Sequence, residues 1–246
     1  MPVKFLIVST GYNCASLAEK CLRGIASQTY KNFTAILIDD GSTDNTKEIL
    51  QQMKNEDDRI RIYISKNNRG AALRRWQAIN ELANINDQVV VVLVGMDDEL
   101  KPNALQRIAQ EYDKGAWMTY GNWIDSDGKM LPPGFLEFSE QIHKDRSYRK
   151  HRYRSTGPNT FKKFLFDQLT ENDFIVKGKW IRATTESNLM FSCLEMCGKD
   201  RIGIIEDPIV LYNRRDDNTV AREGRTYQNA VYNEIIKRPK KPLLRR

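Results

Sequence analysis

Strand-like and helix-like segments alternate four times between residues 5 and 113 of this 246-residue chain. The strand-like segments are short apolar runs, and the segments between them carry apolar residues at helical spacing. Strands and helices that alternate in this way build a parallel sheet with right-handed crossovers. The expected strands are residues 5–8, 33–38, 60–64 and 89–94. The sequence therefore predicts an α/β fold with a mostly parallel sheet flanked by helices.

A polar cluster follows each of the four expected strands. The clusters are residues 10–13, 39–44, 66–70 and 97–99. In open α/β sheets, ligands bind in the crevice outside the carboxyl ends of the strands. We therefore expect the four clusters to form one binding site at that edge of the sheet.

The usual phosphate-binding loops are missing from these clusters. The chain has no GxxxxGK[ST] motif, and no GxGxxG follows the first expected strand. These absences weigh against a nucleoside triphosphatase and against a dinucleotide-dependent oxidoreductase. Nucleotidyl transfer is a weaker alternative for the same reason, because no Gly-rich basic loop is present to hold a triphosphate.

Two of the clusters are acidic. One contains Asp39, Asp40 and Asp44, and the other contains Asp97 and Asp98. Crowded carboxylates repel an anionic ligand unless a divalent cation lies between them, and hard oxygen ligands suit Mg²⁺ or Mn²⁺. The pattern predicts a cation that neutralises a diphosphate leaving group.

The chain changes character after residue 121. Residues 122–157 are rich in Gly, Pro and charge, which indicates long loops that include a hairpin. Further elements are expected as a short helix at 161–169, a helix from Glu186 to Gly198, and two late strands at 202–205 and 209–212, with Asp207 in the turn between them. We expect this half to cap the sheet and to shape the pocket of a second substrate.

The net charge of +7 is concentrated in two segments. Residues 143–154 have six bases and one acid, and residues 237–246 have six bases and no acid, so the rest of the chain is mildly acidic. A phosphorylated or acidic glycan, or an anionic membrane surface carrying a lipid-linked acceptor, would suit such segments. No nucleic-acid partner is expected, because no known nucleic-acid-binding motif is present.

The remaining composition favours a cytoplasmic protein, peripheral at the membrane if the basic tail binds lipid. The longest apolar run is residues 89–94, far below the ~20 residues that span a bilayer. No secretory signal is expected. The four cysteines lack zinc-ligand spacing and are expected to be reduced core thiols. They are Cys14, Cys21, Cys193 and Cys197.

Several of these residues form motifs that resemble those of the glycosyltransferase family 2 domain. The resemblance is strongest over residues 4–112. Its motifs are Tyr12-Asn13, Ser27-Gln28-Thr29-Tyr30, the stretch from Asp39 to Thr46, Asn68-Arg69-Gly70 and Asp97-Asp98. The resemblance implies a GT-A (Rossmann-like) fold and inverting transfer of a sugar from a nucleoside diphosphate sugar, commonly UDP-linked, assisted by Mn²⁺ or Mg²⁺. It also implies a nucleotide-sugar-binding half at 1–121 and an acceptor-binding and catalytic half at 122–236, and the charge distribution adds a basic tail at 237–246.

The resemblance also implies roles for single residues. Asp40 would accept a hydrogen bond from the nucleobase, and Asp97 would bind the metal with Asp98 beside it. The donor-binding set as a whole is Thr10, Tyr12, Asn13, Asp40, Ser42, Lys66, Arg69 and Asp98. Glu186 would deprotonate the acceptor hydroxyl, with a slightly raised pKa. The alternative for Glu186 is an ordinary first-turn acid favoured by the helix dipole.

The acceptor side is defined less sharply by the sequence. Arg149, Arg152 and Arg154 are the candidates for gripping the acceptor or for a lid over the donor. The late Q-x-x-R-W element of processive synthases is absent, which favours a single sugar addition. Gly95 stands where the family often has an additional Asp, and this leaves open a non-catalytic nucleotide- or carbohydrate-binding module on the same fold.

Overall fold

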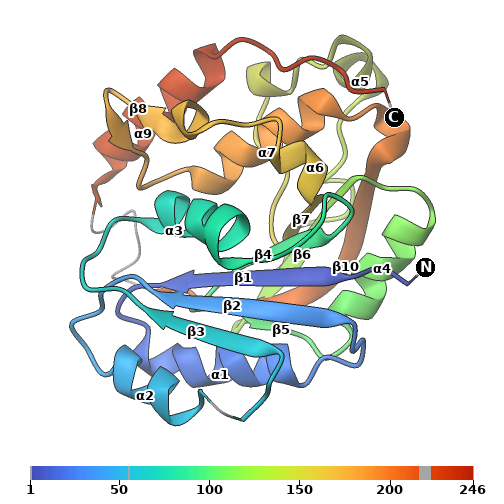
Figure 1. The fold of residues 1–246 in the computed structure, drawn as a ribbon. Helices are drawn as coiled ribbons and strands as arrows, with labels where there is room; N and C mark the ends of the chain where they lie inside the picture. Colours follow the sequence, from blue (N-terminus) through green and yellow to red (C-terminus); the bar gives the residue numbers. More distant parts are fainter. Residues whose placement is uncertain (1, 55, 216–222, 246) are drawn as a thin grey trace.

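A computed structural model describes residues 2–54, 56–215 and 223–245 of the chain. Met1 and Arg246, at the outer ends of the predicted first half and basic tail, lie outside the described residues. The described part is built on a mixed eight-stranded sheet of order β3-β2-β1-β4-β7-β6-β10-β5 (Figure 1). A separate two-stranded ribbon pairs β8 with β9.

The four strands expected from the sequence form one parallel half of the large sheet. They are β1 (Phe5–Gly11), β2 (Phe33–Asp39), β3 (Ile60–Ile64) and β4 (Val90–Gly95). Strand β1 lies in parallel between β2 and β4, and β2 also pairs in parallel with β3. Each of these strands therefore ends at the same edge of the sheet, as the alternation of strand and helix predicts.

The second half extends this sheet beyond β4. Strand β7 (Asn159–Lys162) runs antiparallel between β4 and β6 (Met118–Asp125). Strand β10 (Ile202–Tyr212) is parallel to β6, and the short β5 (Glu99–Leu100) is antiparallel to β10. Because β6 and β10 run in the same direction as β4, their carboxyl ends also reach the edge where the polar clusters lie.

Helices cover both faces of the sheet, and alternate residues of β1 face the two resulting cores. Leu6 and Val8 belong to one core, and Phe5 and Ile7 belong to the other. The first core is covered by α3 (Ala71–Gln77), α6 (Lys163–Phe166), α7 (Thr185–Met196) and α9 (Arg225–Lys237), and the second by α1 (Ala15–Ala26), α2 (Thr46–Gln52) and α4 (Ala104–Asp113) (Figure 1).

The remaining described elements are short. A π-helical turn (Ala78–Leu82) continues α3, and α5 (Glu140–Asp145) lies in the loop-rich region after β6. The ribbon consists of β8 (Ile175–Val176) and β9 (Lys179–Trp180). Three 3-10 turns complete the described set, at Tyr148–Lys150, Glu171–Phe174 and Lys199–Arg201.

Two of the sequence-based element predictions were wrong. The helix expected at 161–169 is instead the end of β7 followed by the single-turn α6, because residues 159–162 pair with β4, and Thr160 and Phe161 also pair with β6. The two late strands are one strand, β10, which passes Glu206, Asp207 and Pro208 with two register shifts against β6. A bulge lets a proline remain in a paired strand, so Asp207 lies within β10 and not in a turn.

The cysteine prediction is confirmed, since all four cysteines are buried and unbridged. Among the described helices, none is long and apolar enough to cross a membrane.

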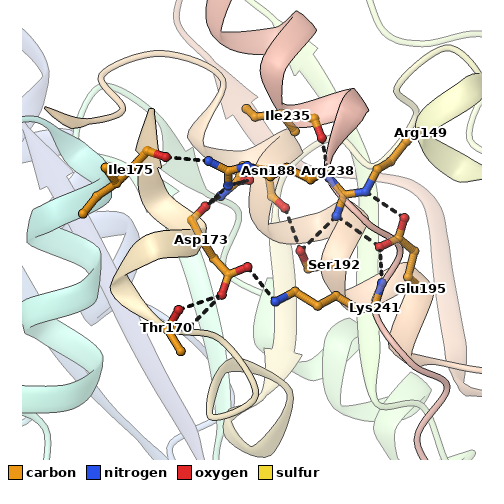
Figure 2. Close-up of polar contacts among 10 residues, drawn as sticks. All are labelled: Arg149, Thr170, Asp173, Ile175, Asn188, Ser192, Glu195, Ile235, Arg238 and Lys241. Atoms are coloured by element: carbon orange, nitrogen blue, oxygen red, sulfur yellow. Dashed lines mark hydrogen bonds and ion pairs between the residues drawn. The ribbon is translucent and has the colours of Figure 1, made fainter. Parts of the chain in front are cut away.

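The basic C-terminal segment is held against the rest of the fold by hydrogen bonds that Arg238 and Leu244 donate. Arg238 donates hydrogen bonds to the carbonyls of Asp173 and Ile175 and to Asn188 Oδ1 of helix α7 (Figure 2). The backbone N–H of Leu244 donates to the carbonyl of Met196 at 2.9 Å. The segment is therefore part of the packing around α7, and not a solvated tail throughout.

Candidate active site

A cavity of about 490 Å³ opens at the carboxyl edge of β1, β2 and β4, where the sequence places the polar clusters. Its volume lies in the range of sites that bind small molecules. Helix α7 and the segment before it close the opposite side. Six of the predicted site residues line this cavity: Thr10, Tyr12, Asp40, Asp97, Asp98 and Glu186.

The Asp40 carboxylate is held by donors from the third loop and from α3. It accepts hydrogen bonds from the backbone N–H groups of Arg69 at 3.0 Å and Gly70 at 2.7 Å, and from Arg74 Nε at 2.6 Å. Its side chain is only 5% exposed. Asp40 therefore fixes the 66–70 loop against the end of β2, so that its rigid position defines one wall of the cavity.

Four predicted donor-binding residues are not among those that line this cavity: Asn13, Ser42, Lys66 and Arg69. Asn13 and Ser42 instead tie the first two loops together, because the Asn13 backbone N–H donates to Ser42 Oγ at 2.9 Å. Arg69 supplies its backbone N–H to Asp40. Asn13, Ser42 and Arg69 therefore shape the loops around the cavity.

Thr10 contributes an unsatisfied polar atom to the cavity wall. Its hydroxyl is buried and, within the described part of the chain, has no hydrogen-bond partner. A buried polar group without a partner costs about 1–3 kcal/mol. A ligand that hydrogen-bonds to this hydroxyl would recover that cost.

Asp97 and Asp98 form the acidic side of the cavity. Asn213 braces the pair, since its backbone N–H donates to Asp98 Oδ1 at 3.1 Å and its Nδ2 to the Asp97 carbonyl at 2.8 Å. Arg215 Nη1 lies 3.7 Å from Asp97 Oδ2. Burial and the charge of Asp97 together raise the pKa of Asp98 well above its ordinary value.

This pair fits a hard divalent cation, which would favour the ionised form of both carboxyls. Among the described residues, no group of three or more His, Cys, Asp or Glu side chains is arranged to hold a metal ion. Mg²⁺ is commonly held by one or two carboxylates, together with substrate phosphates and water. The arrangement therefore suits a cation that binds together with a phosphorylated ligand.

Glu186 lies in the first turn of α7 and pairs with Arg75 of α3. Arg75 Nη1 is 2.6 Å from Glu186 Oε1 and 2.8 Å from Thr185 Oγ1. Desolvation by the cavity walls opposes ionisation, but the charge and hydrogen bond of Arg75, with hydrogen bonds from the helix backbone and Thr185, outweigh it. The pKa of Glu186 is therefore held below its ordinary value, and the sequence-based expectation of a raised pKa was wrong.

Two further arginines in the cavity wall, beside Arg75, were not found from the sequence: Arg182 and Arg215. Arg182 Nε donates to Glu223 Oε1 at 2.6 Å, and its Nη2 donates to Asn68 Oδ1. No local motif marks these arginines, because each reaches the cavity only through contacts far apart in the chain. For Arg75, the one available signal is its place beside Arg74, directly after the apolar residues 71–73.

The basic segment 143–154 does not contribute arginines to this cavity, and Arg149 in particular is a structural residue. Arg149 is 8% exposed and pairs with Glu195 at 2.7 Å (Figure 2). Arg152 and Arg154 have their guanidinium carbons 4.7 and 5.5 Å from the ring centre of Phe135. The prediction that Arg149 grips an acceptor or moves as part of a lid was wrong, because its guanidinium is buried in this network.

Comparison with known proteins identifies the family. The family model described as glycosyl transferase family 2 matches residues 6–180. A relative in Campylobacter jejuni, named GalNAc(5)-diNAcBac-PP-undecaprenol beta-1,3-glucosyltransferase, is 28% identical over 177 residues, which cover 70% of this chain and 56% of that protein. The chain spans less than two thirds of the length of the first curated relatives that it matches.

Solved structures share the fold at low sequence identity. Staphylococcus aureus TarS 1–349 in complex with UDP-GlcNAc has a TM-score of 0.64 and 16% identity, over 89% of this chain and 61% of that one. The mannosyltransferase PcManGT from Pyrobaculum calidifontis, in complex with GDP-Man and Mn²⁺, has a TM-score of 0.61 and 17% identity. The match covers 98% of this chain and 68% of that one. These similarities confirm the predicted α/β fold of the GT-A type. Since the family model covers more than half of its residues, the chain belongs to glycosyl transferase family 2.

Proposed function

We propose that this chain is an inverting glycosyltransferase that moves a single sugar from a UDP-linked donor to a hydroxyl group of a glycan or lipid-linked acceptor. The observation that carries the proposal is the position of Glu186 in the wall of the same cavity as Asp97 and Asp98. A general base and a diphosphate site must both reach the anomeric carbon. Both would lie in one cavity at the strand ends, which supports the proposal.

The donor is assigned to the side formed by the first three loops. Thr10 Oγ1, buried and unpaired within the described residues, would donate to or accept from the nucleoside. Tyr12 and Asp40 complete this wall, and Arg215 adds positive charge on the diphosphate side. TarS binds UDP-GlcNAc and PcManGT binds GDP-Man in structures of the same fold, which supports a nucleotide-sugar donor.

Asp97 and Asp98 would hold Mn²⁺ or Mg²⁺. When bound, this cation would supply positive charge to the departing diphosphate. The presence of Mn²⁺ in the PcManGT structure supports a divalent ion. Because Gly95 replaces a third possible carboxylate, the protein supplies only this pair of aspartates from the β4 loop.

Glu186 would act as the general base. Its lowered pKa keeps the carboxylate ionised at neutral pH and able to accept a proton. The acceptor hydroxyl gives its proton to a Glu186 oxygen while its own oxygen bonds to the anomeric carbon. The bond from that carbon to the diphosphate breaks, and the electron pair leaves with the diphosphate on the opposite face, which inverts the anomeric centre.

The acceptor is assigned from the Campylobacter jejuni relative, whose name describes glucosyl transfer to a lipid-linked glycan. A cytoplasmic protein that touches the membrane peripherally would reach such an acceptor. The candidate contact is the end of the basic C-terminal segment, beyond Lys241, where Leu243 is 41% exposed. Flotation with anionic liposomes of the intact chain and of a chain that ends at Lys241 tests this contact, and equal flotation would contradict it.

Thermal unfolding with nucleotides tests the donor assignment. UDP with Mn²⁺ is expected to stabilise the protein by ~2.7 kcal/mol at a ligand concentration about 100-fold above Kd. Asp97→Ala should lose the part of this stabilisation that depends on Mn²⁺. If no nucleoside diphosphate raises the unfolding temperature, the donor assignment is wrong.

Turnover tests the assignment of the base and separates an enzyme from a binding module. Glu186→Gln should keep the stabilisation by UDP and lose transfer. Slow hydrolysis of a nucleotide sugar without an acceptor would argue against the non-catalytic alternative. Undiminished transfer by Glu186→Gln would show that another group is the base.

A further inference from the structure

A second cavity, of about 340 Å³, adjoins the first and shares part of its wall. The shared residues include Arg75, Asp98, Glu186 and Tyr212. Glu186 therefore faces both cavities. A base that takes a proton from one substrate while that substrate attacks another must contact both, and this position meets that requirement.

The wall of the second cavity carries an aromatic pair, of which only Tyr212 also lines the first cavity. Trp123 of β6 and Tyr212 of β10 have ring centroids 5.2 Å apart and planes inclined by 50°. Both residues are partly exposed and line the cavity. The face of an aromatic ring carries partial negative charge, which attracts the weakly positive C–H groups on the flat side of a pyranose ring.

Unsatisfied polar atoms lie in the same wall. Ser155 is 0% exposed, and its hydroxyl has no hydrogen-bond partner among the residues that the structure describes. The same holds, within those residues, for Nε of Arg75, whose side chain is 9% exposed. Leaving such groups unpaired is costly, and ligand hydroxyls of suitable reach would satisfy them.

The charge of the second cavity disfavours an anionic occupant. Among the described residues, its lining contains two carboxyl side chains, Asp98 and Glu186, and one cation, Arg75, which is already paired with Glu186. Within the described residues, the lining therefore offers a phosphate or a uronic acid no cation that is not already paired. The basic segment 143–154 cannot reverse this, because Arg149 is engaged with Glu195 and neither Arg152 nor Arg154 lines the cavity.

We propose that the second cavity is the acceptor site and that it binds a neutral pyranose, stacked on Trp123 and Tyr212 and hydrogen-bonded to Ser155. This inference rests on the proposed function, and it narrows the acceptor from glycans in general to those that end in an uncharged sugar. The ring would lie between the aromatic pair and Glu186, with the attacking hydroxyl directed to the Glu186 carboxylate.

Ligand-observed NMR in the absence of any donor tests the proposal on the full chain. The probes are methyl β-glycosides of glucose, galactose, N-acetylglucosamine and N-acetylgalactosamine, with methyl β-glucuronide and glucose 6-phosphate as anionic counterparts. At least one neutral glycoside should bind, and both anionic probes should bind more weakly. Binding of no neutral glycoside, or preferred binding of an anionic probe, would overturn the proposal.

Two variants locate the bound sugar. Trp123→Ala should weaken glycoside binding at least about tenfold, which corresponds to ~1.4 kcal/mol, while Trp123→Phe, which keeps an aromatic ring, should weaken it less. Ser155→Ala should also weaken binding with little disturbance of packing. Stabilisation by UDP and Mn²⁺, measured on every variant, reports whether the fold and the first cavity are intact.

Different results would contradict the proposed function and the proposed acceptor site. If the wild-type chain binds neither UDP nor a nucleotide sugar, the proposed function fails whatever the glycosides do. If UDP binds normally but Trp123→Ala and Ser155→Ala bind glycosides as tightly as the wild type, the acceptor site lies elsewhere and the inference fails alone.

Discussion

Arg75 Nη1 lies 2.6 Å from Glu186 Oε1, so that an ion pair joins helix α3 of the first half of the chain to the first turn of α7. Arg75 is nearly buried, whereas the Glu186 side chain is 41% exposed toward the cavities. The arginine therefore orients the carboxylate and leaves one side of it open to ligands. It also keeps the carboxylate ionised, which a general base requires.

The Arg75–Glu186 pair predicts a change in the pH dependence of activity. Replacing Arg75 with Gln removes the charge that lowers the Glu186 pKa, while the desolvation that raises it remains. Activity requires ionised Glu186 and is lost as the pH falls through this pKa. The acid limb of the kcat/KM profile should therefore move to higher pH in Arg75→Gln.

Arg75→Lys is the matched control, because it keeps a positive charge at this position. Its acid limb should stay close to that of the wild type even if kcat falls through altered geometry. An acid limb that does not move in Arg75→Gln would mean that the profile reports a group other than Glu186.

The first half of the fold could be predicted from the sequence because its signals are local. Each buried parallel strand is a short apolar run, and polar residues lie at or shortly after its carboxyl end, as at Asp39–Asp40 and Asp97–Asp98. The parallel topology then brings the loops together without further information. For this reason five predicted site residues of this half line one cavity, namely Thr10, Tyr12, Asp40, Asp97 and Asp98.

The second half could not be predicted in the same way, because long-range pairing decides its structure. Phe161 and Lys162 fall within the helix expected at 161–169 and instead end strand β7, because β4 and β6 lie on either side of it. Arg149 reads as a surface charge in the sequence and is buried by Glu195, 46 residues away in the chain. Likewise, nothing near Arg75 in the sequence indicates that Glu186 is its partner.

The pair between Arg74 and Asp40 predicts a stability effect separate from catalysis. Arg74 is 8% exposed, and besides Asp40 it donates to the Asn67 carbonyl at 2.7 Å. Arg74→Met leaves the buried Asp40 carboxylate without its charged partner. We expect the free energy of unfolding in urea to fall by about 3–5 kcal/mol.

A surface arginine provides the comparison for this measurement. Arg23 forms an ion pair with Glu19, but its side chain is 61% exposed. Arg23→Met should leave the urea midpoint unchanged within error. Equal midpoints for Arg74→Met and the wild type would show that the buried pair does not stabilise the second and third loops.

Gly95 predicts a specific effect on metal binding. A Cβ atom at this position would collide with Oδ1 of Asp97 and lie 3.3 Å from Oδ2 of Asp98. Because the Asp97 carboxylate would have to move, Gly95→Ala should weaken the stabilisation by Mn²⁺ in the presence of UDP, measured as the difference between Mn²⁺ and chelator. Stabilisation by UDP in chelator should stay near the wild-type value.

The same collision predicts that an aspartate at position 95, where the family often has one, does not strengthen metal binding in this chain. Gly95→Asp adds a carboxylate, yet its Cβ displaces the one at Asp97. We therefore expect Gly95→Asp to bind Mn²⁺ no more tightly than the wild type. Tighter binding would show that the β4 loop can rearrange to accept a third carboxylate.

The C-terminal segment predicts a link between the chain end and the position of α7. Arg238 Nη1 donates to Asn188 Oδ1 at 2.9 Å, two residues after Glu186, and Lys241 Nζ pairs with Asp173 at 2.6 Å (Figure 2). The backbone N–H of Lys241 also donates to Glu195 Oε2, which is the partner of Arg149. These contacts fix the first turn of α7 against the loop before β8.

Arg238→Met keeps the length of the side chain and removes three hydrogen bonds to buried or partly buried acceptors. We expect it to lower the free energy of unfolding by about 3 kcal/mol, because each lost charge-assisted hydrogen bond leaves an acceptor unsatisfied. We also expect kcat to fall more than KM rises, because Glu186 loses its alignment while the donor loops stay in place.

Arg245→Met, which replaces an exposed arginine of the same segment, is the control and should change neither the free energy of unfolding nor kcat. If Arg238→Met lowered stability but left kcat unchanged at a temperature where it is folded, the segment would stabilise α7 without positioning its first turn.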